Sequence, residues 1–325
     1  MKSSLEITQL FSKELAQLNW SKEPRGLYEP IGYVLSLGGK RIRPALTLMA
    51  CNLFSDDVQP AINTALGLEI FHNFTLLHDD IMDRADVRRG KPTVHKKWND
   101  NTAILSGDVM QIAAYQFIAK TPTEYLKPVL DLFSQTAAEI CEGQQLDVDF
   151  ENRDNVKAEE YLEMIRLKTA VLLGCALKSG ALMGGAGEED AQLLYDFGIN
   201  IGLAFQLKDD LLDVYGEEST FGKKIGGDIL CNKKTYLLIH ALKLAKGDDA
   251  LELQNWLESG DENLSDQKIL AITLLYNKLG VKLICEEKMH VFYTKAIANL
   301  EKVSVLENKK QELRKLANKL MFRND

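Results

Sequence analysis

The distribution of proline constrains the fold of this chain more than any other sequence feature. All seven prolines lie at or before Pro128, and no proline follows in the rest of the 325 residues. Proline breaks helices, so its absence over such a length favours long uninterrupted helices. Runs of alternating Val, Ile and Thr between tight turns, which mark strands, are nearly absent. We therefore expect an all-α fold.

Apolar residues recur at helical spacing. In residues 65–78 they fall at Leu66, Ile70, Phe74 and Leu77. The stretches 161–182 and 191–214 are apolar on more than one face, which is typical of helices at the centre of a bundle. No low-complexity linker or fixed repeat divides the chain, so residues 1–325 are expected to form a single helical domain.

Composition excludes several classes of protein. The net charge of −8 argues against sequence-independent nucleic-acid binding, which rests on basic residues. Five scattered cysteines without a CxxC pair indicate reduced thiols in a cytoplasmic protein. The first 20 residues lack the apolar core of a signal peptide. The most apolar stretch, residues 170–186, is too short and too interrupted for a membrane span.

Two aspartate-rich segments share one pattern. Asp79, Asp80 and Asp83 belong to DDIMD, and Asp209, Asp210 and Asp213 belong to DDLLD. Each segment follows a long apolar stretch with helical character. Since positions i and i+4 lie on one face of a helix, the first and last aspartates of each segment point the same way. The second aspartate lies at the edge of that face.

Such clusters require a cation. Three carboxylates at the end of an apolar helix repel one another and resist burial. Mg²⁺ takes oxygen ligands, often one or two carboxylates, and completes its shell with water and substrate phosphates. A solvated acidic helix end is the alternative for one copy, but two copies favour several Mg²⁺ ions around a diphosphate.

Basic residues accompany both clusters. They lie in GGKRIRP at 38–44, RRG at 88–90, KTA at 168–170, GKKIGGD at 222–228 and NKKT at 232–235. Arginine binds phosphate in a bidentate way, and lysine acts as a mobile point charge. Lys168 interrupts an apolar run, where an unpaired ammonium is costly, so we expect a carboxylate or phosphate partner. His72 is either a donor to phosphate or a hydrogen-bonded core histidine.

In this order, and with GQQLD at 143–147 and FQLKDDLLD at 205–213, the motifs resemble the trans-isoprenyl diphosphate synthase family, also called polyprenyl synthetases. The resemblance spans about residues 30–240. It implies a helical bundle of the isoprenoid synthase type with a central apolar cavity, and a homodimer. It also implies a Mg²⁺-dependent prenyltransferase that joins isopentenyl diphosphate head to tail to an allylic diphosphate.

The resemblance further implies a role for each motif residue. Three Mg²⁺ ions per active site are bound by Asp79, Asp83 and Asp209, supported by Asp80, Asp210 and Asp213. The allylic diphosphate is held by Arg88, Lys168, Lys233 and either Lys223 or Lys224, near Thr169 and Gln206. Isopentenyl diphosphate is held by Lys40, Arg43, His72 and Arg89. The aspartates and Lys168 act in catalysis by stabilising the departing diphosphate.

Phe74 is the candidate for control of product length. It lies five residues before Asp79, so it is roughly 7.5 Å deeper along the helix, where a prenyl chain would grow. A bulky aromatic there resembles archaeal geranylgeranyl synthases and favours a twenty-carbon product, with farnesyl diphosphate as the alternative. The alternative is that Phe74 is only a core residue. In that case Ile70 or Phe71, from either subunit, limits the length of the product.

Other functions fit the motifs less well. A class I terpene cyclase usually replaces the second aspartate cluster and has no isopentenyl diphosphate site. A head-to-head condensing enzyme is disfavoured for the same reason. A non-catalytic subunit of a heteromeric synthase typically loses aspartates from one cluster, whereas both are intact here. A structural metal-binding bundle gives no reason for the basic motifs.

Overall fold

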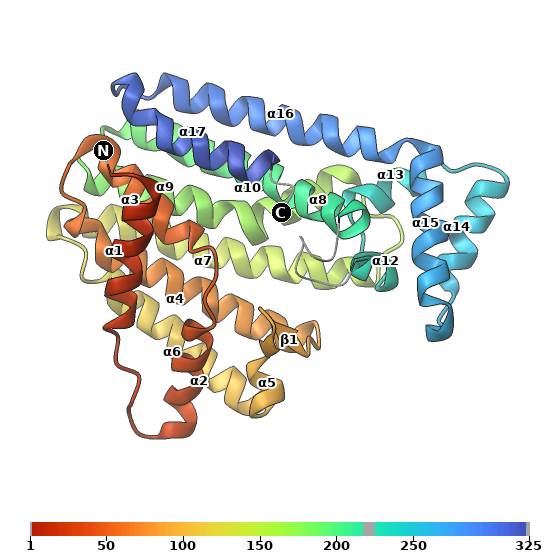
Figure 1. The fold of residues 1–325 in the computed structure, drawn as a ribbon, viewed down its shortest axis with the longest axis horizontal. Coiled ribbons are helices and arrows are strands. Elements are labelled where there is room, and N and C mark those ends of the chain that lie inside the picture. Colours follow the sequence, from red (N-terminus) through yellow and green to blue (C-terminus); the bar gives the residue numbers. More distant parts are fainter. Residues whose placement is uncertain (1, 217–224, 323–325) are drawn as a thin grey trace. The chain divides into compact units, whose positions relative to one another are not determined.

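Most described residues are helical in the computed structural model, which describes residues 2–216 and 225–322 (Figure 1). The first helices are α1 (Ser4–Ala16), α2 (Arg25–Ser36), α3 (Ile42–Phe54), α4 (Gln59–Met82), α5 (Val94–Lys97) and α6 (Asp100–Ile118). The middle helices are α7 (Thr123–Glu151), α8 (Ala158–Ile165), the π-helix η1 (Arg166–Ala170), α9 (Val171–Met183) and α10 (Glu188–Tyr215). The expected all-α fold is confirmed.

The last part of the chain is also helical. It contains α12 (Gly227–Leu230), α13 (Tyr236–Leu244), α14 (Asp248–Glu258), the 3₁₀ turn η2 (Glu262–Leu264), α15 (Ser265–Leu279), α16 (Val281–Lys302) and α17 (Glu307–Phe322). Among the described residues, the only strands are β1 (Val87–Arg88) and β2 (Lys91–Pro92), which pair antiparallel as a two-residue hairpin. No described helix has the length and apolarity needed to cross a membrane.

The contacts group the chain into two compact units. Unit 1 comprises Met1–Gln135, Leu172–Tyr195 and Lys302–Leu313, and unit 2 comprises Thr136–Val171, Asp196–Glu301 and Arg314–Asp325. The DDIMD segment belongs to unit 1 and the DDLLD segment to unit 2. The single-domain organisation expected from the sequence stays a prediction.

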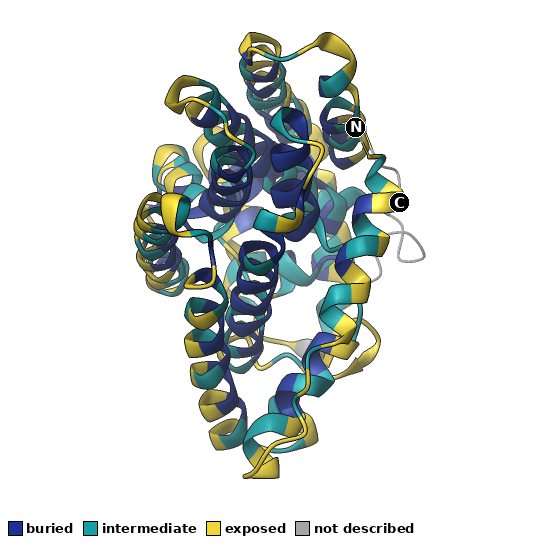
Figure 2. Cartoon of the chain, turned by 90° about the vertical axis from the view of Figure 1, so that its left-hand side faces the viewer, coloured by how far each residue is buried: buried dark blue, intermediate teal, exposed yellow. Residues whose placement is uncertain are grey.

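Unit 1 is built around α4. This helix packs against α3 and α6, while α1 packs on α3 and α2 packs on α6. Fully buried side chains such as Leu48, Leu68 and Phe71 form its core. The α9 backbone comes so close to α3 that a Cβ on Gly180 would lie 2.0 Å from the Thr47 carbonyl oxygen. Buried and exposed residues alternate along individual helices, as expected for amphipathic helices (Figure 2).

Unit 2 has a separate apolar core. It includes Tyr161, Leu207, Leu237, Ile272 and Cys285, all nearly inaccessible to solvent. In this unit α13 contacts α8 and α15, and α15 also contacts α12 and α14. The core therefore fixes the helices that carry Lys168 and the second aspartate cluster.

Candidate active site

The first aspartate cluster lies at the carboxyl end of α4. Asp79 and Asp80 are in its last turn, and Asp83 is its C-cap residue. The carboxyl end of a helix already carries a partial negative charge, which adds to the repulsion among the carboxylates. Asp80 is buried, Asp79 is half-buried and Asp83 is exposed. This arrangement disfavours three unpaired charges and favours bound cations.

Arg88 provides a positive charge beside this cluster. Its Nε donates to both carboxylate oxygens of Asp80, at 2.8 and 2.9 Å, and its guanidinium lies 3.7 Å from Asp79. Burial raises the pKa of Asp80 although Arg88 acts in the opposite direction. The β1–β2 hairpin positions Arg88, and its two turn residues, Arg89 and Gly90, both have positive φ, as a tight hairpin requires.

Arg43 and His72 face each other between α3 and α4. The Arg43 guanidinium lies 3.1 Å from Nε2 of His72. Since arginine can only donate, His72 accepts through Nε2 and carries its proton on Nδ1. Burial and the charges of Arg43, Arg89, Arg88 and Arg41 hold the pKa of His72 well below its usual range. His72 is therefore neutral and orients Arg43.

Three further basic residues of unit 1, Arg89, Arg41 and Lys40, lie at or contact the turn before α3. Arg89 donates to the carbonyl oxygen of Gly38, and Arg41 pairs with Glu69. Lys40 is exposed on the same turn. The predicted ligands of isopentenyl diphosphate thus belong to one unit, together with the first aspartate cluster.

The second aspartate cluster lies near the carboxyl end of α10. Asp210 is buried, accepts a hydrogen bond from the Tyr161 hydroxyl and accepts another from Gln206 Nε2 at 3.3 Å. Thr169 Oγ1 donates to Gln206 Oε1 at 3.4 Å, which extends the chain of hydrogen bonds to η1. Burial and the charge of Asp228 raise the pKa of Asp210 to about 7, against the effect of both hydrogen bonds.

The other two aspartates of this cluster differ in exposure. Asp213 is buried, and its carboxylate accepts a hydrogen bond from the backbone N–H of Asp228 at 3.0 Å. Asp209 is half-buried. The first turn of α12 therefore holds Asp213.

Lys168 has the carboxylate partner that its apolar surroundings predict. Its Nζ donates to Asp147 Oδ2 at 2.6 Å, and Nζ of Lys233 lies 3.8 Å from the same oxygen. Burial would raise the pKa of Asp147, but the two lysine charges and the Lys168 hydrogen bond lower it below its usual value. Asp147 thus joins two predicted diphosphate ligands. Lys223 and Lys224 lie outside the described residues.

A π-helical turn presents Lys168. The turn, η1, packs so tightly on α7 that a Cβ on Gly143 would lie 2.3 Å from the backbone nitrogen of Lys168. Glycine at this position is therefore required by the close approach of the two backbones. Such single-turn π segments often occur at functional sites.

Sequence reasoning did not assign a role to three residues that hold site groups. Asp147 pairs with the lysines, Tyr161 holds Asp210, and Glu69 pairs with Arg41. Asp147 ends the GQQLD motif, and Glu69 is an acid in an otherwise apolar helix. An acid in an apolar run predicts a basic partner, and this signal was available for Glu69.

The donor set suits Mg²⁺. Among residues 2–216 and 225–322, no three acidic, histidine or cysteine side chains form a closed metal cage. Mg²⁺ does not need one, because it keeps several waters and takes phosphate oxygens together with one or two carboxylates. Asp79 and Asp83, one turn apart, and Asp209 provide carboxylates of this kind.

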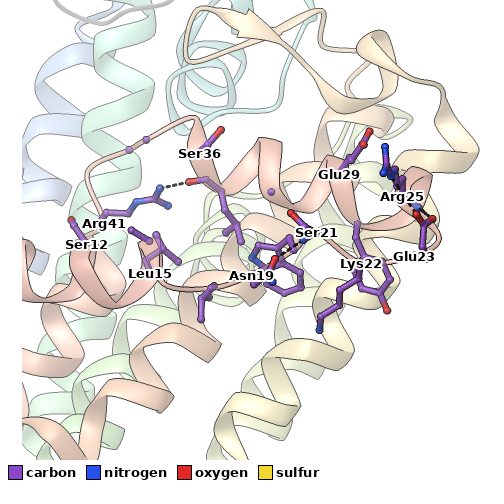
Figure 3. Close-up of a pocket in the computed structure, with 18 of the residues that line it drawn as sticks. Ser12, Leu15, Asn19, Ser21, Lys22, Glu23, Arg25, Glu29, Ser36 and Arg41 are labelled. Carbon is purple, nitrogen blue, oxygen red and sulfur yellow. Dashed lines mark hydrogen bonds and ion pairs between the residues drawn. The ribbon is translucent and has the colours of Figure 1, made fainter.

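A pocket of about 970 Å³ also lies in unit 1 (Figure 3). The ends of α1 and α2 and the Gly38–Gly39 turn line it, and Arg41 reaches its wall. No aspartate of the DDIMD segment contributes to this lining. The pocket thus lies beside the turn before α3.

Comparison with known proteins identifies the family. The model of the polyprenyl synthetase family matches residues 24–273. A geranylgeranyl diphosphate synthase of Methanosarcina mazei is 40% identical over 282 residues, covering 82% of this chain and 86% of that protein. A geranylfarnesyl diphosphate synthase of Natronomonas pharaonis is 41% identical over 238 residues, covering 68% of this chain and 70% of that protein.

Solved structures agree with these relatives. A crystal structure of a geranylgeranyl pyrophosphate synthase superposes with a TM-score of 0.95 and 45% sequence identity, and all of both chains is covered. The family model spans most of the chain, including both aspartate clusters and the basic motifs between them. The chain therefore belongs to the polyprenyl synthetase family.

Proposed function

We propose that this protein condenses isopentenyl diphosphate with allylic diphosphates to give geranylgeranyl diphosphate. The observation that carries the proposal is the pairing of two intact aspartate clusters with two sets of basic residues in a polyprenyl synthetase. The names of the relatives support this activity: several are geranylgeranyl diphosphate synthases, and two are geranylfarnesyl diphosphate synthases.

The proposal assigns three Mg²⁺ ions to the site. Asp79, Asp83 and Asp209 are the proposed ligands, while Asp80, Asp210 and Asp213 support them. Bound Mg²⁺ supplies electrostatic stabilisation of the negative charge that develops on the departing diphosphate.

Different basic residues bind each of the two substrates. Lys168 and Lys233, held by Asp147, neutralise the diphosphate of the allylic substrate as its C–O bond breaks. Arg43, oriented by neutral His72, holds isopentenyl diphosphate so that its double bond attacks the allylic carbon.

The remaining steps need no side-chain nucleophile. A carbon–carbon bond forms, one proton leaves the former isopentenyl unit, and the released diphosphate accepts that proton. Each cycle therefore lengthens the allylic chain by one five-carbon unit and releases one diphosphate.

Phe74 supports a short product. Only 8% of its surface is exposed, and its ring contacts Phe71 and His78, with ring centroids 5.4 and 4.8 Å away. Phe71 in turn packs on Phe133. These rings pack together, and the bulk of Phe74 before Asp79 on α4 supports a limit near twenty carbons. Farnesyl diphosphate is the alternative product.

Two alternatives, a class I terpene cyclase and a non-catalytic subunit of a heteromeric synthase, are less well supported. Both aspartate clusters are complete, and Arg43, Arg89 and Lys40 form a basic set that a cyclase would not need. The Arg43–His72 pair favours a synthase that binds a second diphosphate substrate.

We also propose a homodimer located in the cytoplasm. In unit 1, α6 exposes the apolar side chains of Ile104, Leu105 and Ile112, of which 43%, 57% and 58% are accessible. Large exposed apolar side chains along one helix are typical of a protein–protein contact. Light scattering of the purified protein tests this: a monomeric mass would contradict it.

Incubation with Mg²⁺, isopentenyl diphosphate and dimethylallyl, geranyl or farnesyl diphosphate tests the activity. The expected product, after dephosphorylation, is a linear twenty-carbon alcohol. EDTA should abolish its formation, and Asp79→Ala or Asp209→Ala should lower turnover by orders of magnitude. Absence of isopentenyl diphosphate consumption with every primer would contradict the proposal.

A further inference from the structure

The turn before α3 depends on a strained residue. Arg41 is the N-cap of α3 and has left-handed backbone angles, φ 48° and ψ 39°. Residues other than glycine rarely adopt this conformation unless surrounding contacts hold them there. The Arg41 side chain supplies such contacts.

The Arg41 guanidinium joins three helices. One end pairs with Glu69 on α4, and the other donates to the carbonyl oxygen of Leu35, near the end of α2, at 2.6 Å (Figure 3). Only 9% of the Arg41 side chain and 2% of the Glu69 side chain are accessible. A buried charge without its partner is strongly unfavourable, so each depends on the other.

Glu69 is itself held in place. Asn73, fully buried one turn later on α4, donates to Glu69 Oε1 at 2.9 Å and to its backbone carbonyl oxygen at 2.8 Å. Among the described residues, Glu69 Oε2 and Arg43 Nε are buried without a hydrogen-bond partner. Glu69 is thus a fixed anion beside the arginines of the site.

The turn also restrains Arg89. The Arg89 guanidinium donates to the Gly38 carbonyl oxygen, and a Cβ on Gly39 would lie 2.8 Å from its Cζ. The contacts therefore run from Glu69 through Arg41 to the turn, and from the turn to Arg89.

We infer that Glu69 is a positioning residue for diphosphate binding. It acts through Arg41, whose guanidinium contacts both the Glu69 carboxylate and the Leu35 carbonyl oxygen. This inference rests on the proposed function, since it names a determinant of the isopentenyl diphosphate site. Glu69 does not touch substrate. Its negative charge by itself would repel a diphosphate, so positioning and simple electrostatics predict opposite effects of its removal.

Calorimetry with inorganic diphosphate in EDTA tests the inference without turnover. EDTA removes divalent ions, so diphosphate cannot bind through Mg²⁺ at the aspartate clusters, and Arg43→Gln identifies the arginine site by loss of binding. Glu69→Gln should weaken binding about tenfold, the effect of losing one strong charged hydrogen bond. Arg41→Lys keeps the charge but cannot reach both Glu69 and Leu35, so it should also weaken binding.

Thr64→Val is the matched control. Thr64 is fully buried on the same helix and hydrogen-bonds Thr121 at 2.8 Å, so the variant loses a buried contact without touching an arginine. Equal or tighter binding by Glu69→Gln, unchanged binding by Arg41→Lys, or equal weakening by Thr64→Val would overturn the inference. Failure of the wild-type protein to bind diphosphate in EDTA would overturn it too.

Turnover separates the inference from the proposed function. In the Mg²⁺ assay, Glu69→Gln should raise the KM for isopentenyl diphosphate about tenfold and change kcat and the allylic KM less than about twofold. A wild-type protein that binds diphosphate but makes no prenyl product would refute the proposed function, and the binding comparison would still decide the role of Glu69.

Discussion

Replacing Phe74 by alanine should lengthen the product by one five-carbon unit. Phe74 lies about one and a half turns before Asp79 on α4, and Ile70 lies four residues deeper, or roughly 6 Å by helical rise. With carbon–carbon bonds of about 1.5 Å, the four-bond repeat of an isoprenoid chain spans roughly 5 Å. The space down to Ile70 therefore fits one further unit and not two.

The same substitution should destabilise the protein. Phe74 is buried, with only 8% of its surface exposed. The substitution removes its ring contacts with Phe71 and His78. Truncating a buried phenylalanine typically costs about 3–5 kcal/mol. We expect a loss within this range for the free protein, because no prenyl chain occupies the new space there. Thermal unfolding of the free protein measures the loss.

Chromatography of the dephosphorylated products is the assay. Phe11→Ala is the control, because Phe11 is fully buried on α1, which carries no site motif. That variant should be destabilised to a similar extent and still make the wild-type product. A folded Phe74→Ala protein with unchanged product length would refute the reasoning. If Phe71→Ala then lengthened the product, Phe71 would be the limiting residue.

Three further changes test the second unit. Asp147→Asn removes the charged partner that Lys168 and Lys233 share. The KM for the allylic substrate should therefore rise about tenfold, which is the effect of losing one charged hydrogen bond. Unchanged kinetics would contradict this prediction. Gly143→Ala forces a collision with the η1 backbone and should lower stability by about 1–3 kcal/mol, measured by urea unfolding, whereas an unchanged midpoint would show that the helices can separate. Asp210→Asn should raise the melting temperature of the metal-free protein at pH 8. Because the raised pKa of about 7 means that folding takes up a proton, the wild-type stability should fall from pH 4 to 7, and a flat profile would contradict it.

The sequence predicted the helices and the motifs because both depend on local spacing. The expected helical residues 65–78 lie inside α4, and residues 191–214 lie inside α10. Proline placement and apolar periodicity act within a few turns, so they can be read without knowledge of the fold. The pairing of Lys168 with a carboxylate was also predictable, because a buried ammonium needs a partner.

The identity of that partner was not predictable. Asp147 lies 21 residues before Lys168, and only the packing of η1 against α7 brings them together. Helical spacing alone would also not reveal the π turn, because no local pattern distinguishes it from a continuous α-helix. The neutral state of His72 depends on its burial and on arginines from two separate segments, residues 41–43 and 88–89.

The sequence by itself determined the fold class, the two aspartate segments and the basic motifs, since residue type and local spacing specify each of them. The tertiary structure decided which charges meet: Glu69 with Arg41 across 28 residues, and Tyr161 with Asp210 across 49. Such pairs depend on how helices pack side by side, and packing is set by the whole apolar core of each unit, which no short segment encodes.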